Sequence, residues 1–187
     1  MPPALRFVTS NRDKIKEAEE ILQRPVEGIH LELEELQSPD LEAVVRHKAA
    51  LAFRSVGGAL LVEDTALSFA AWGGLPGTLV RHFLDRLGVD GLYRALAPLK
   101  DLAAVASSGV GFHDGWRLHY FHGQVAGTIV PPRGAGGFGF DPLFQPAGEE
   151  ETFAEMAQAR KHALSMRGKA LRELARHLEN NPPRRGS

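Results

Sequence analysis

The most constraining feature of the sequence is the run from Ala59 to Leu67, where four apolar residues lead directly into two carboxylates and a hydroxyl. A short unbroken apolar run is typical of a strand that is buried on both faces of a sheet. Glu63 and Asp64 at the end of such a strand would be costly to bury without a partner. A cation would offset that cost, and Mg²⁺ is usually held by one or two carboxylates together with substrate phosphates. The alternative is that Glu63 and Asp64 open a solvent-exposed turn.

The composition fits a single globular domain. The chain has 187 residues, of which 43% are hydrophobic and 24% charged, so it can form a core that needs no disulfide. It has no cysteine, so neither disulfides nor thiolate metal sites are available. Its net charge is −1, so no strong electric field would draw it to a nucleic acid polymer or an anionic membrane. No segment approaches the roughly 20 apolar residues of a membrane span. We therefore expect a cytoplasmic protein with one domain at residues 1–179 and a flexible tail at residues 180–187.

The N-terminal segment predicts a strand, a tight turn and a helix. Residues 5–9 favour a strand, residues 9–11 (Thr-Ser-Asn) are good helix N-cap types, and residues 15–22 show apolar positions at helical spacing. A helix N-terminus carries unpaired amide groups and partial positive charge, which suits a phosphate, and Lys14 would add its ammonium. The alternative is an ordinary capped helix with a solvated lysine.

The remaining patterns predict alternating strands and helices. They indicate a half-buried strand at residues 29–33, helices at 41–56, 78–87 and 91–99, strands at 103–112, 118–123 and 124–130, and a helix that follows a capping box at 152–155. Lys48 lies in the middle of the 41–56 helix, where a lysine is normally solvated but could also reach a phosphate. Trp116 and residues 119–121 gather aromatic and histidine side chains, which we interpret as sheet packing rather than a stacking surface.

A second stretch suited to ligand binding is the glycine-aromatic loop, residues 131–142, which holds four glycines in six positions before two phenylalanines and an acid. Glycine lets a backbone approach a ligand closely. Phe138 and Phe140 offer faces on which a flat ring can stack, and Asp141 can accept a hydrogen bond from such a ring. The alternative is a flexible loop that the two phenylalanines anchor in the core.

The last helix predicts an inward arginine. Leu171, Leu174 and Leu178 form its buried stripe, Ser165 is a plausible cap, and one turn before Leu171 the same stripe reaches Arg167. A guanidinium on the inward face is expensive without a partner. We therefore expect Arg167 to point into a cleft.

Taken together, these motifs resemble those of the inosine triphosphate pyrophosphatase family, also called XTP/dITP diphosphatases. In chain order the matching pieces are residues 7–11 (Phe-Val-Thr-Ser-Asn) with Lys14, 62–65 (Val-Glu-Asp-Thr), 73–77 (Gly-Gly-Leu-Pro-Gly), 138–142 (Phe-Gly-Phe-Asp-Pro), 152–156 (Thr-Phe-Ala-Glu-Met) and the segment from Lys161 to Arg167. Each of these motifs alone is weak evidence for the family. Their shared order and spacing over nearly the whole chain make the resemblance specific.

The resemblance implies an α/β fold with a long mixed central β-sheet flanked by helices, and two lobes with a nucleotide cleft between them. It implies a homodimeric enzyme that hydrolyses the triphosphates of deaminated purines (ITP, dITP and XTP) to monophosphate and pyrophosphate with Mg²⁺. Its substrate would be a purine nucleoside triphosphate, and its role the removal of wrong bases from the nucleotide pool.

The resemblance also implies roles for individual residues. Asp64 matches the acid that binds metal and accepts the proton of the attacking water, and Glu35 falls near a second metal-linked carboxylate. Phosphate contacts are implied for Thr9, Ser10, Asn11, Arg12, Asp13, Lys14, Lys48 and Arg81, and another substrate contact for Thr65. The nucleoside pocket is implied at Phe138, Gly139, Phe140, Asp141, Lys161, Met166 and Arg167.

Physical chemistry supports this division of labour. Deaminated purines carry a carbonyl at position 6 where adenine carries an amino group, and a guanidinium can only donate hydrogen bonds. Arg167 would therefore favour the carbonyl and oppose the amino group. The chain has Met166 where the family usually has histidine, and methionine can pack on a base without a useful hydrogen bond. Base discrimination is then looser, or His162 compensates.

Two other functions remain open at this stage. The first is a pyrophosphatase of broader or different base preference, such as one that acts on modified pyrimidine or ordinary triphosphates. The second is a nucleotide-binding protein without catalytic activity, although the presence of Asp64, Lys14 and Lys161 argues against it.

Overall fold

The structure is a computed structural model that describes residues 4–181 of the chain. Within these residues, seven strands form one sheet in the order β2-β1-β3-β5-β6-β7, with β4 paired to β3. β1 runs parallel to β2 and β3, and the remaining pairs are antiparallel. The sequence prediction of a mixed sheet in an α/β fold is therefore confirmed.

The elements have the following bounds. The strands are β1 (Leu5–Val8), β2 (Val26–Ile29), β3 (Ala59–Phe69), β4 (Pro76–Gly77), β5 (Ala103–Asp114), β6 (Leu118–Ile129) and β7 (Phe144–Pro146). The helices are α1 (Arg12–Leu22), α2 (Leu41–Val56), α3 (Val80–Leu96), α4 (Gln158–Leu164) and α5 (Met166–Asn180), with 3-10 turns η1 (Ala70–Trp72) and η2 (Asp141–Leu143). The predicted tail at 180–187 begins at the last residue of α5, and residues 182–187 lie outside the described range. No helix among the described residues is long and apolar enough to cross a bilayer.

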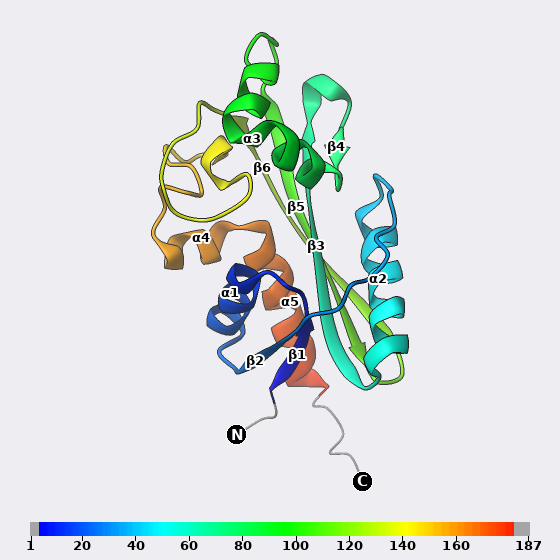
Figure 1. Ribbon diagram of the computed structural model, residues 1–187. Coiled ribbons are helices and arrows are strands. Elements are labelled where there is room, and N and C mark those ends of the chain that lie inside the picture. The colour runs from blue at the N-terminus through cyan, green and yellow to red at the C-terminus, as the bar shows by residue number, and fades with distance from the viewer. Residues whose placement is uncertain (1–3, 182–187) are drawn as a thin grey trace.

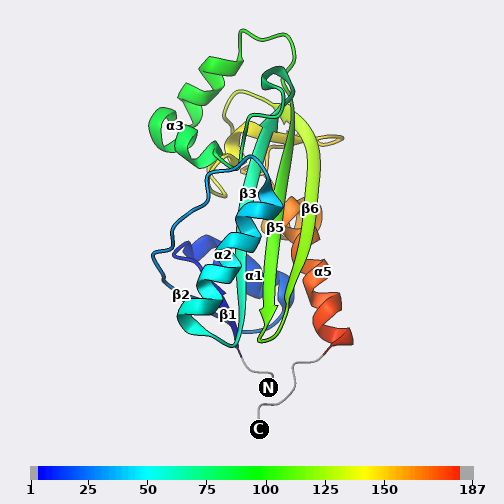
Figure 2. The ribbon, with the colours of Figure 1, turned by 90° about the vertical axis from the view of Figure 1, so that its right-hand side faces the viewer.

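Three long strands organise the molecule. Figures 1 and 2 show β3, β5 and β6 running along most of its length, with α1 and α5 over one face, α2 over the opposite face and α3 at the far end. Leu61 packs in a cluster with residues of α1 and α5, whereas Leu60 and Val62 pack in a cluster with residues of α2. Side chains alternate between the faces of a strand, so β3 is buried on both faces, as its apolar run predicts.

The second strand is not where the sequence pattern placed it. The prediction was residues 29–33, but β2 covers Val26–Ile29 and the chain is irregular from residue 30 to 39. β2 pairs in register with β1, from Leu5 opposite Val26 to Val8 opposite Ile29. Because β1 ends at Val8, residues 30–33 have no strand to pair with.

The prediction of two strands at 118–123 and 124–130 is wrong, because β6 is one continuous strand from Leu118 to Ile129. The break was placed at Gly123, and the structure gives this glycine another purpose. A Cβ at Gly123 would lie 2.0 Å from the Met166 carbonyl oxygen. The missing side chain therefore lets the start of α5 pack directly against the strand.

The capping box at Thr152 does not start a helix. The Thr152 amide donates to Glu155 Oε2 at 2.8 Å, as such a box requires, but the next helix begins only at Gln158. The Thr152 hydroxyl instead donates to the Arg133 carbonyl at 3.0 Å. The pair therefore stabilises a turn and ties it to the glycine-aromatic loop.

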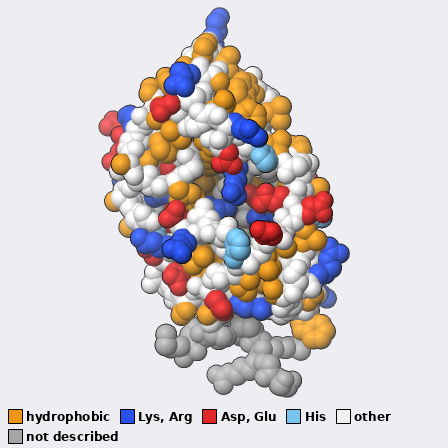
Figure 3. Space-filling view, in the orientation of Figure 1, with side chains coloured by type: hydrophobic (Ala, Val, Ile, Leu, Met, Phe, Trp, Pro, Cys, Tyr) orange, Lys and Arg blue, Asp and Glu red, His pale blue; other side chains and the backbone are white. Residues whose placement is uncertain are grey.

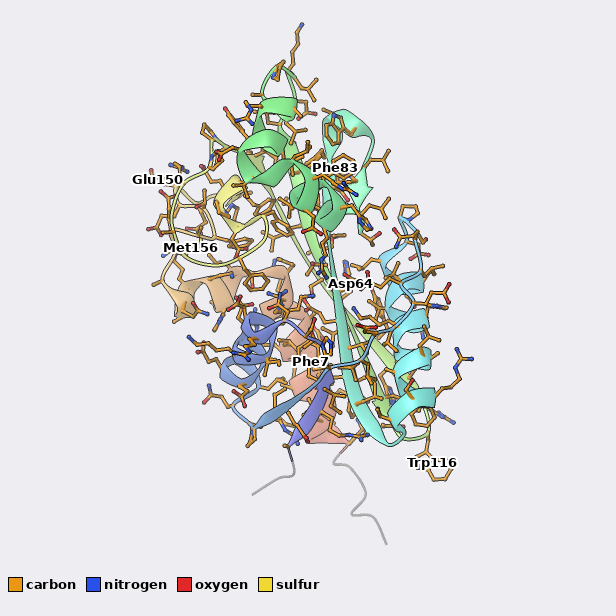
Figure 4. The ribbon with its side chains drawn as sticks, in the orientation of Figure 1. Phe7, Asp64, Phe83, Trp116, Glu150 and Met156 are labelled. Carbon is orange, nitrogen blue, oxygen red and sulfur yellow. The ribbon has the colours of Figure 1, made fainter. Side chains whose placement is uncertain are left out.

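Two further expectations need correction. The predicted helices at 78–87 and 91–99 form one helix, α3, that is kinked at Gly88 and ends at Leu96. Trp116 does not pack in the sheet, because it is 89% exposed at the turn between β5 and β6, where Figure 4 shows it pointing away from the molecule. Tyr120 and Phe121 do pack against core clusters, as predicted.

Candidate functional site

A cleft of about 790 Å³ opens beside the middle of β3. It is lined by the turn after β1, the loop after β2, the middle of α2 and β3, the start of α3, the glycine-aromatic loop and the start of α5. Figure 3 shows the hollow at the centre of this face, where basic, acidic and histidine side chains gather. Charged groups from distant parts of the sequence therefore meet at one place.

Most residues singled out in the sequence lie on this cleft. Its lining includes Thr9, Ser10, Asn11, Asp13, Lys14, Glu35, Lys48, Asp64, Thr65, Arg81, Phe138, Gly139, Phe140, Asp141, Met166 and Arg167. Two residues do not line it. Arg12 is exposed at the start of α1, and Lys161 is buried at 3% exposure beneath the Phe138 ring.

The turn after β1 has the predicted helix cap. Asn11 Oδ1 accepts hydrogen bonds from the amides of Asp13 at 2.9 Å and Lys14 at 3.2 Å, and Thr9 Oγ1 accepts from the Asn11 amide at 3.2 Å. The alternative of a solvated lysine is wrong, because the Lys14 side chain is only 14% exposed and its Nζ lies 3.1 Å from Glu63 Oε2. This turn thus presents a capped helix terminus and a half-buried ammonium to the cleft.

The two carboxylates of β3 have separate environments. They lie in the interior of the strand, so the alternative of a solvent-exposed turn is wrong. Glu63 points toward α1 and α5 and is 2% exposed, whereas Asp64 is half-buried and lines the cleft, as Figure 4 shows at the centre of the molecule. The cationic side chains of Lys14 and Arg167 make the burial of Glu63 tolerable.

Behind the cleft wall, six buried or half-buried charges form a continuous series that we call the charge chain. It runs Lys14, Glu63, Arg167, Glu17, Lys161 and Asp141, with signs that alternate at every step. Successive charged atoms lie 3.1, 2.9, 2.5, 2.6 and 2.7 Å apart. Arg167 was expected to avoid the core and point into a cleft, and it lines the cleft while its guanidinium is buried between two carboxylates.

The charge chain opposes the effect of burial on the pKa values of Glu63 and Lys161, whereas burial still raises the pKa of Asp141 at its end. Burial alone would raise the pKa of Glu63, but the charges of Arg167 and Lys14 and the hydrogen bonds from Ser108 and Arg167 lower it to about 2. Burial would lower the pKa of Lys161, yet the carboxylates of Asp141 and Glu17 raise it. These opposing effects follow from placing each charge between partners of opposite sign.

The glycine-aromatic loop closes over the end of the charge chain. Phe138 lies 5.0 Å above both the Lys161 ammonium and the Arg167 guanidinium, and its amide donates to Asp141 Oδ2 at 2.7 Å. Gly137 has φ of 68°, and a Cβ there would lie 2.2 Å from Asp141 Oδ2. Phe140 is buried in a core cluster, so one phenylalanine anchors the loop while the other faces the cleft.

The opposite side of the cleft, which we call the open rim, consists of Glu35, Lys48, Arg81 and Asp85. Its ion pairs are long and solvated: Lys48 Nζ lies 3.9 Å from Glu35 Oε1, and Arg81 Nε lies 3.7 Å from Asp85 Oδ2. The four side chains are 19%, 49%, 78% and 64% exposed for Lys48, Glu35, Arg81 and Asp85. These groups can therefore change partners at little cost.

The carboxylates that face the cleft suit a divalent cation that arrives with its ligand. No group of three or more His, Cys, Asp or Glu side chains in residues 4–181 is arranged to hold a metal by itself. Asp64 Oδ1 accepts from the Thr65 amide at 2.8 Å, and its second oxygen has no protein donor among the described residues. Mg²⁺ needs only one or two carboxylates when phosphates and waters complete its shell, so Asp64 and Glu35 fit that ion.

Sequence reasoning missed Glu17, the centre of the charge chain. Glu17 was assigned no role from the sequence, but it is 3% exposed and contacts Lys161 and Arg167. A signal existed, because Glu17 lies beside Ala18 on the buried side of α1. His82, which lines the cleft and lies 3.1 Å from Gln37 Oε1, carried no sequence signal.

Comparisons with known proteins identify relatives along nearly the whole chain. An inosine triphosphate pyrophosphatase of Tuber melanosporum is 41% identical over 187 residues, which covers 97% of this chain and 100% of that protein. An inosine triphosphate pyrophosphatase of Puccinia graminis f. sp. tritici is 38% identical over 184 residues and covers 93% and 96%. The similarity therefore extends over nearly the whole length of both relatives.

Solved structures show the same fold. A HAM1 protein from Coxiella burnetii superposes with a TM-score of 0.82 at 26% identity and covers 96% of this chain and 100% of that one. The Ham1 protein of Staphylococcus aureus superposes with a TM-score of 0.81 at 22% identity and covers 95% and 99%. Residues 5–177 match the model of the Ham1 family, and the chain belongs to that family.

Proposed function

We propose that this protein hydrolyses the triphosphates of deaminated purines (ITP, dITP and XTP) to the monophosphate and pyrophosphate with Mg²⁺, and so cleanses the nucleotide pool of the cytoplasm. The proposal rests on one observation, which is that the two ends of a single cleft offer different chemistry. One end has a capped helix terminus with Lys14 and the carboxylate of Asp64, and the other has the inward guanidinium of Arg167 beneath Phe138. The name shared by the two fungal relatives supports it.

The phosphate end would bind and neutralise the triphosphate. The first turn of α1, Lys14, Lys48 and Arg81 all face the cleft, and they would hold the phosphates by charge-assisted hydrogen bonds. Asp64 and Glu35 would hold Mg²⁺, which when bound neutralises charge that develops on the phosphate oxygens. Residues of both ends would thus form a nucleotide cleft between two lobes.

Asp64 would act on the attacking water. Its Oδ2, which has no protein donor among residues 4–181, would accept the proton as the water oxygen bonds to the phosphorus nearest the nucleoside. The bond from that phosphorus to the bridging oxygen breaks, and pyrophosphate leaves with the bond electrons. Thr65 fixes the orientation of Asp64, because its amide donates to Oδ1.

The base end would select the purine. Phe138 offers an aromatic face, and Arg167 and Lys161 lie 5.0 Å from its ring. A guanidinium donates to the carbonyl at position 6 of hypoxanthine or xanthine and opposes the amino group of adenine. Met166, which is 3% exposed and packs in a core cluster as well as lining the cleft, would contact the base by packing alone.

A substrate panel tests the proposal. We expect the purified protein with Mg²⁺ to release pyrophosphate from ITP, dITP and XTP much faster than from ATP or dUTP, with GTP included in the panel and orthophosphate measured separately in the same samples. Equal rates on ATP and ITP would contradict the base preference, and release of orthophosphate would contradict the bond that is cleaved. ITP that binds with Mg²⁺ present but is not cleaved would indicate a binding protein instead. Sedimentation of the same sample tests for the homodimer that we also propose.

A further inference from the structure

The charge chain joins the two ends of the candidate substrate site. Lys14 belongs to the turn that faces the phosphates, and Asp141 belongs to the loop that faces the base. Between them every side chain contacts two partners of opposite charge, with no gap longer than 3.1 Å. A change in charge at one end must therefore alter the electrostatic energy of the neighbouring charged side chain, because buried charges interact strongly when little water screens them.

Glu63 is the link between Lys14 and Arg167, and its two oxygens have unequal support. Oε1 accepts hydrogen bonds from Ser108 Oγ at 2.8 Å and from Arg167 Nε at 2.9 Å. Oε2 has no hydrogen-bond donor among the described residues, and its ion-pair partner there is Lys14 Nζ at 3.1 Å. The side chain is 1% exposed, so solvent does not replace a partner that leaves.

A polyphosphate that engages Lys14 would draw its ammonium toward the cleft. The attraction between Lys14 and Glu63 Oε2 would then weaken. The positive charge of Arg167 would have to stabilise more of the negative charge of the buried Glu63 carboxylate. A stronger Glu63–Arg167 pair restricts the guanidinium to one orientation before a base arrives. Because a pre-organised group loses less entropy on binding, a base that accepts from Arg167 would bind more tightly.

We propose that Glu63 is a positioning residue that couples the two ends of the substrate, so that a polyphosphate on Lys14 strengthens the binding of a 6-oxo-purine at Arg167. Glu63 touches neither ligand in this scheme and acts through its two cationic partners. The inference rests on the proposed function for the identity of the two ligands. It goes beyond that function because it states that the affinities of the two ends depend on each other.

Separate ligand fragments test the coupling without turnover. Calorimetry without metal would measure the affinity of inosine for the full-length protein with and without saturating tripolyphosphate, and then the reverse. We expect tripolyphosphate to tighten inosine binding by about 5-fold or more, within the range usual for coupled sites, and inosine to tighten tripolyphosphate by the same factor. In Glu63→Gln, which keeps the shape but removes the charge, we expect the factor to approach one.

A second variant and a control guard against a folding defect in Glu63→Gln. Ser108→Ala removes the 2.8 Å hydrogen bond to Oε1 but keeps the charge of Glu63, so the coupling factor should fall only partly. Glu42→Gln removes a carboxylate from an exposed pair with Arg46 on α2 and should leave the factor unchanged. In the wild-type protein, tripolyphosphate alone should also shift the NMR signal of Arg167 Nε–H, and the shift should vanish in Glu63→Gln if that variant is folded.

The outcomes separate the two proposals. Independent binding of inosine and tripolyphosphate to the wild-type protein, or an equal coupling factor in folded Glu63→Gln, would overturn the coupling and leave the proposed function intact. No binding of inosine at all, together with no hydrolysis of ITP, would overturn both. A coupling factor that is lost in Glu63→Gln, reduced in Ser108→Ala and unchanged in Glu42→Gln would support the role of Glu63.

Discussion

The two walls of the cleft hold their charges in opposite ways. The charge chain has its four central members at 2–3% exposure, with charged atoms 2.5–3.1 Å apart. The open rim has pairs at 3.7 and 3.9 Å on side chains that are up to 78% exposed. Three members of the charge chain, Lys14, Arg167 and Asp141, line the same cleft as the open rim, and the other three lie behind its wall.

The contrast indicates a division of labour. A buried charge is tolerated only with its partners in place, so the inner members of the charge chain are costly to rearrange and suit a group that must always be recognised in the same geometry. Lys14, at the more exposed end, can follow a ligand at lower cost. The open rim exchanges long ion pairs for water or for a ligand at little cost. It therefore suits phosphates and a metal ion, which change charge and position during hydrolysis.

The largest expected effect concerns Asp64, which lies on β3 next to Glu63 but faces the cleft. We expect Asp64→Asn to lower pyrophosphate release from ITP by about 10²–10⁴-fold, the usual contribution of a general base. Stability should change by less than about 0.5 kcal/mol, because the asparagine oxygen can still accept from the Thr65 amide. Initial rates and urea unfolding measure the two quantities. A variant that keeps a tenth of wild-type activity would exclude Asp64 as the proton acceptor.

The next effect compares the two walls by stability. Glu17→Ala would leave the buried cations of Lys161 and Arg167 under-compensated, and breaking such a buried pair typically costs about 3–5 kcal/mol. Glu35→Ala, the matched variant on the open rim, removes one end of a 3.9 Å solvated pair and should cost less than about 0.5 kcal/mol. Denaturant unfolding of the two variants measures both values. Equal losses of stability would contradict the contrast between the walls.

A third effect, on acid stability, follows from the pKa of Glu63, which is lowered from 4.5 to about 2 in the folded protein. A lowered pKa stabilises the folded state above the unfolded value of about 4.5, and this stabilisation is lost as the pH falls through about 2. The shift corresponds to a free energy of unfolding on the order of 3 kcal/mol. Glu63→Gln resembles the protonated side chain at every pH.

The stability difference between wild type and Glu63→Gln should therefore narrow as the pH falls from about 5 to about 2. Unfolding in urea at intervals of half a pH unit measures it. Glu42→Gln, which alters an exposed pair with Arg46 on α2 and leaves Glu63 and its partners in place, serves as the control and should follow the wild-type pH dependence. A difference that stays constant with pH would show that Glu63 is not held ionised by Lys14 and Arg167.

Features that depend on local sequence patterns were predicted better than features that depend on contacts between distant residues. The helix cap at Asn11, the doubly buried strand around Leu61 and the stripe of α5 depend on local periodicity and turn chemistry, and the structure confirms all three. The limits of β2 were missed because pairing with β1 sets them. β2 begins at Val26, opposite Leu5 at the start of β1, and not where apolar and polar side chains alternate in the sequence.

The charge chain depends on contacts that no local pattern contains. Glu17 meets Lys161 from 144 residues away and Arg167 from 150 residues away. The sequence correctly marked Arg167 as an inward charge, but it could not supply the partner. Glu63 was recognised as a buried acid that needs a cation, and the structure places two cationic side chains, Lys14 and Arg167, beside it. Periodicity thus identifies which charges must be satisfied, whereas the fold decides what satisfies them.

The smallest predicted effect sharpens the comparison at Arg167, which belongs to the charge chain and also lines the cleft. Arg167→Lys keeps the positive charge between Glu17 and Glu63 but replaces a planar fork of donors with a single ammonium. We expect the preference for ITP over ATP, as a ratio of kcat/KM values, to fall about 10-fold, which corresponds to about 1.4 kcal/mol. The rate on ITP itself should fall less than the ratio, since the groups proposed to act at phosphorus lie on other elements. Arg172→Lys, on the same helix but bonded to the carbonyls that end α4, is the control and should leave the ratio unchanged. An unchanged ratio in Arg167→Lys would mean that the guanidinium serves only to neutralise Glu17 and Glu63, and that base selection rests on Phe138 and the backbone of its loop.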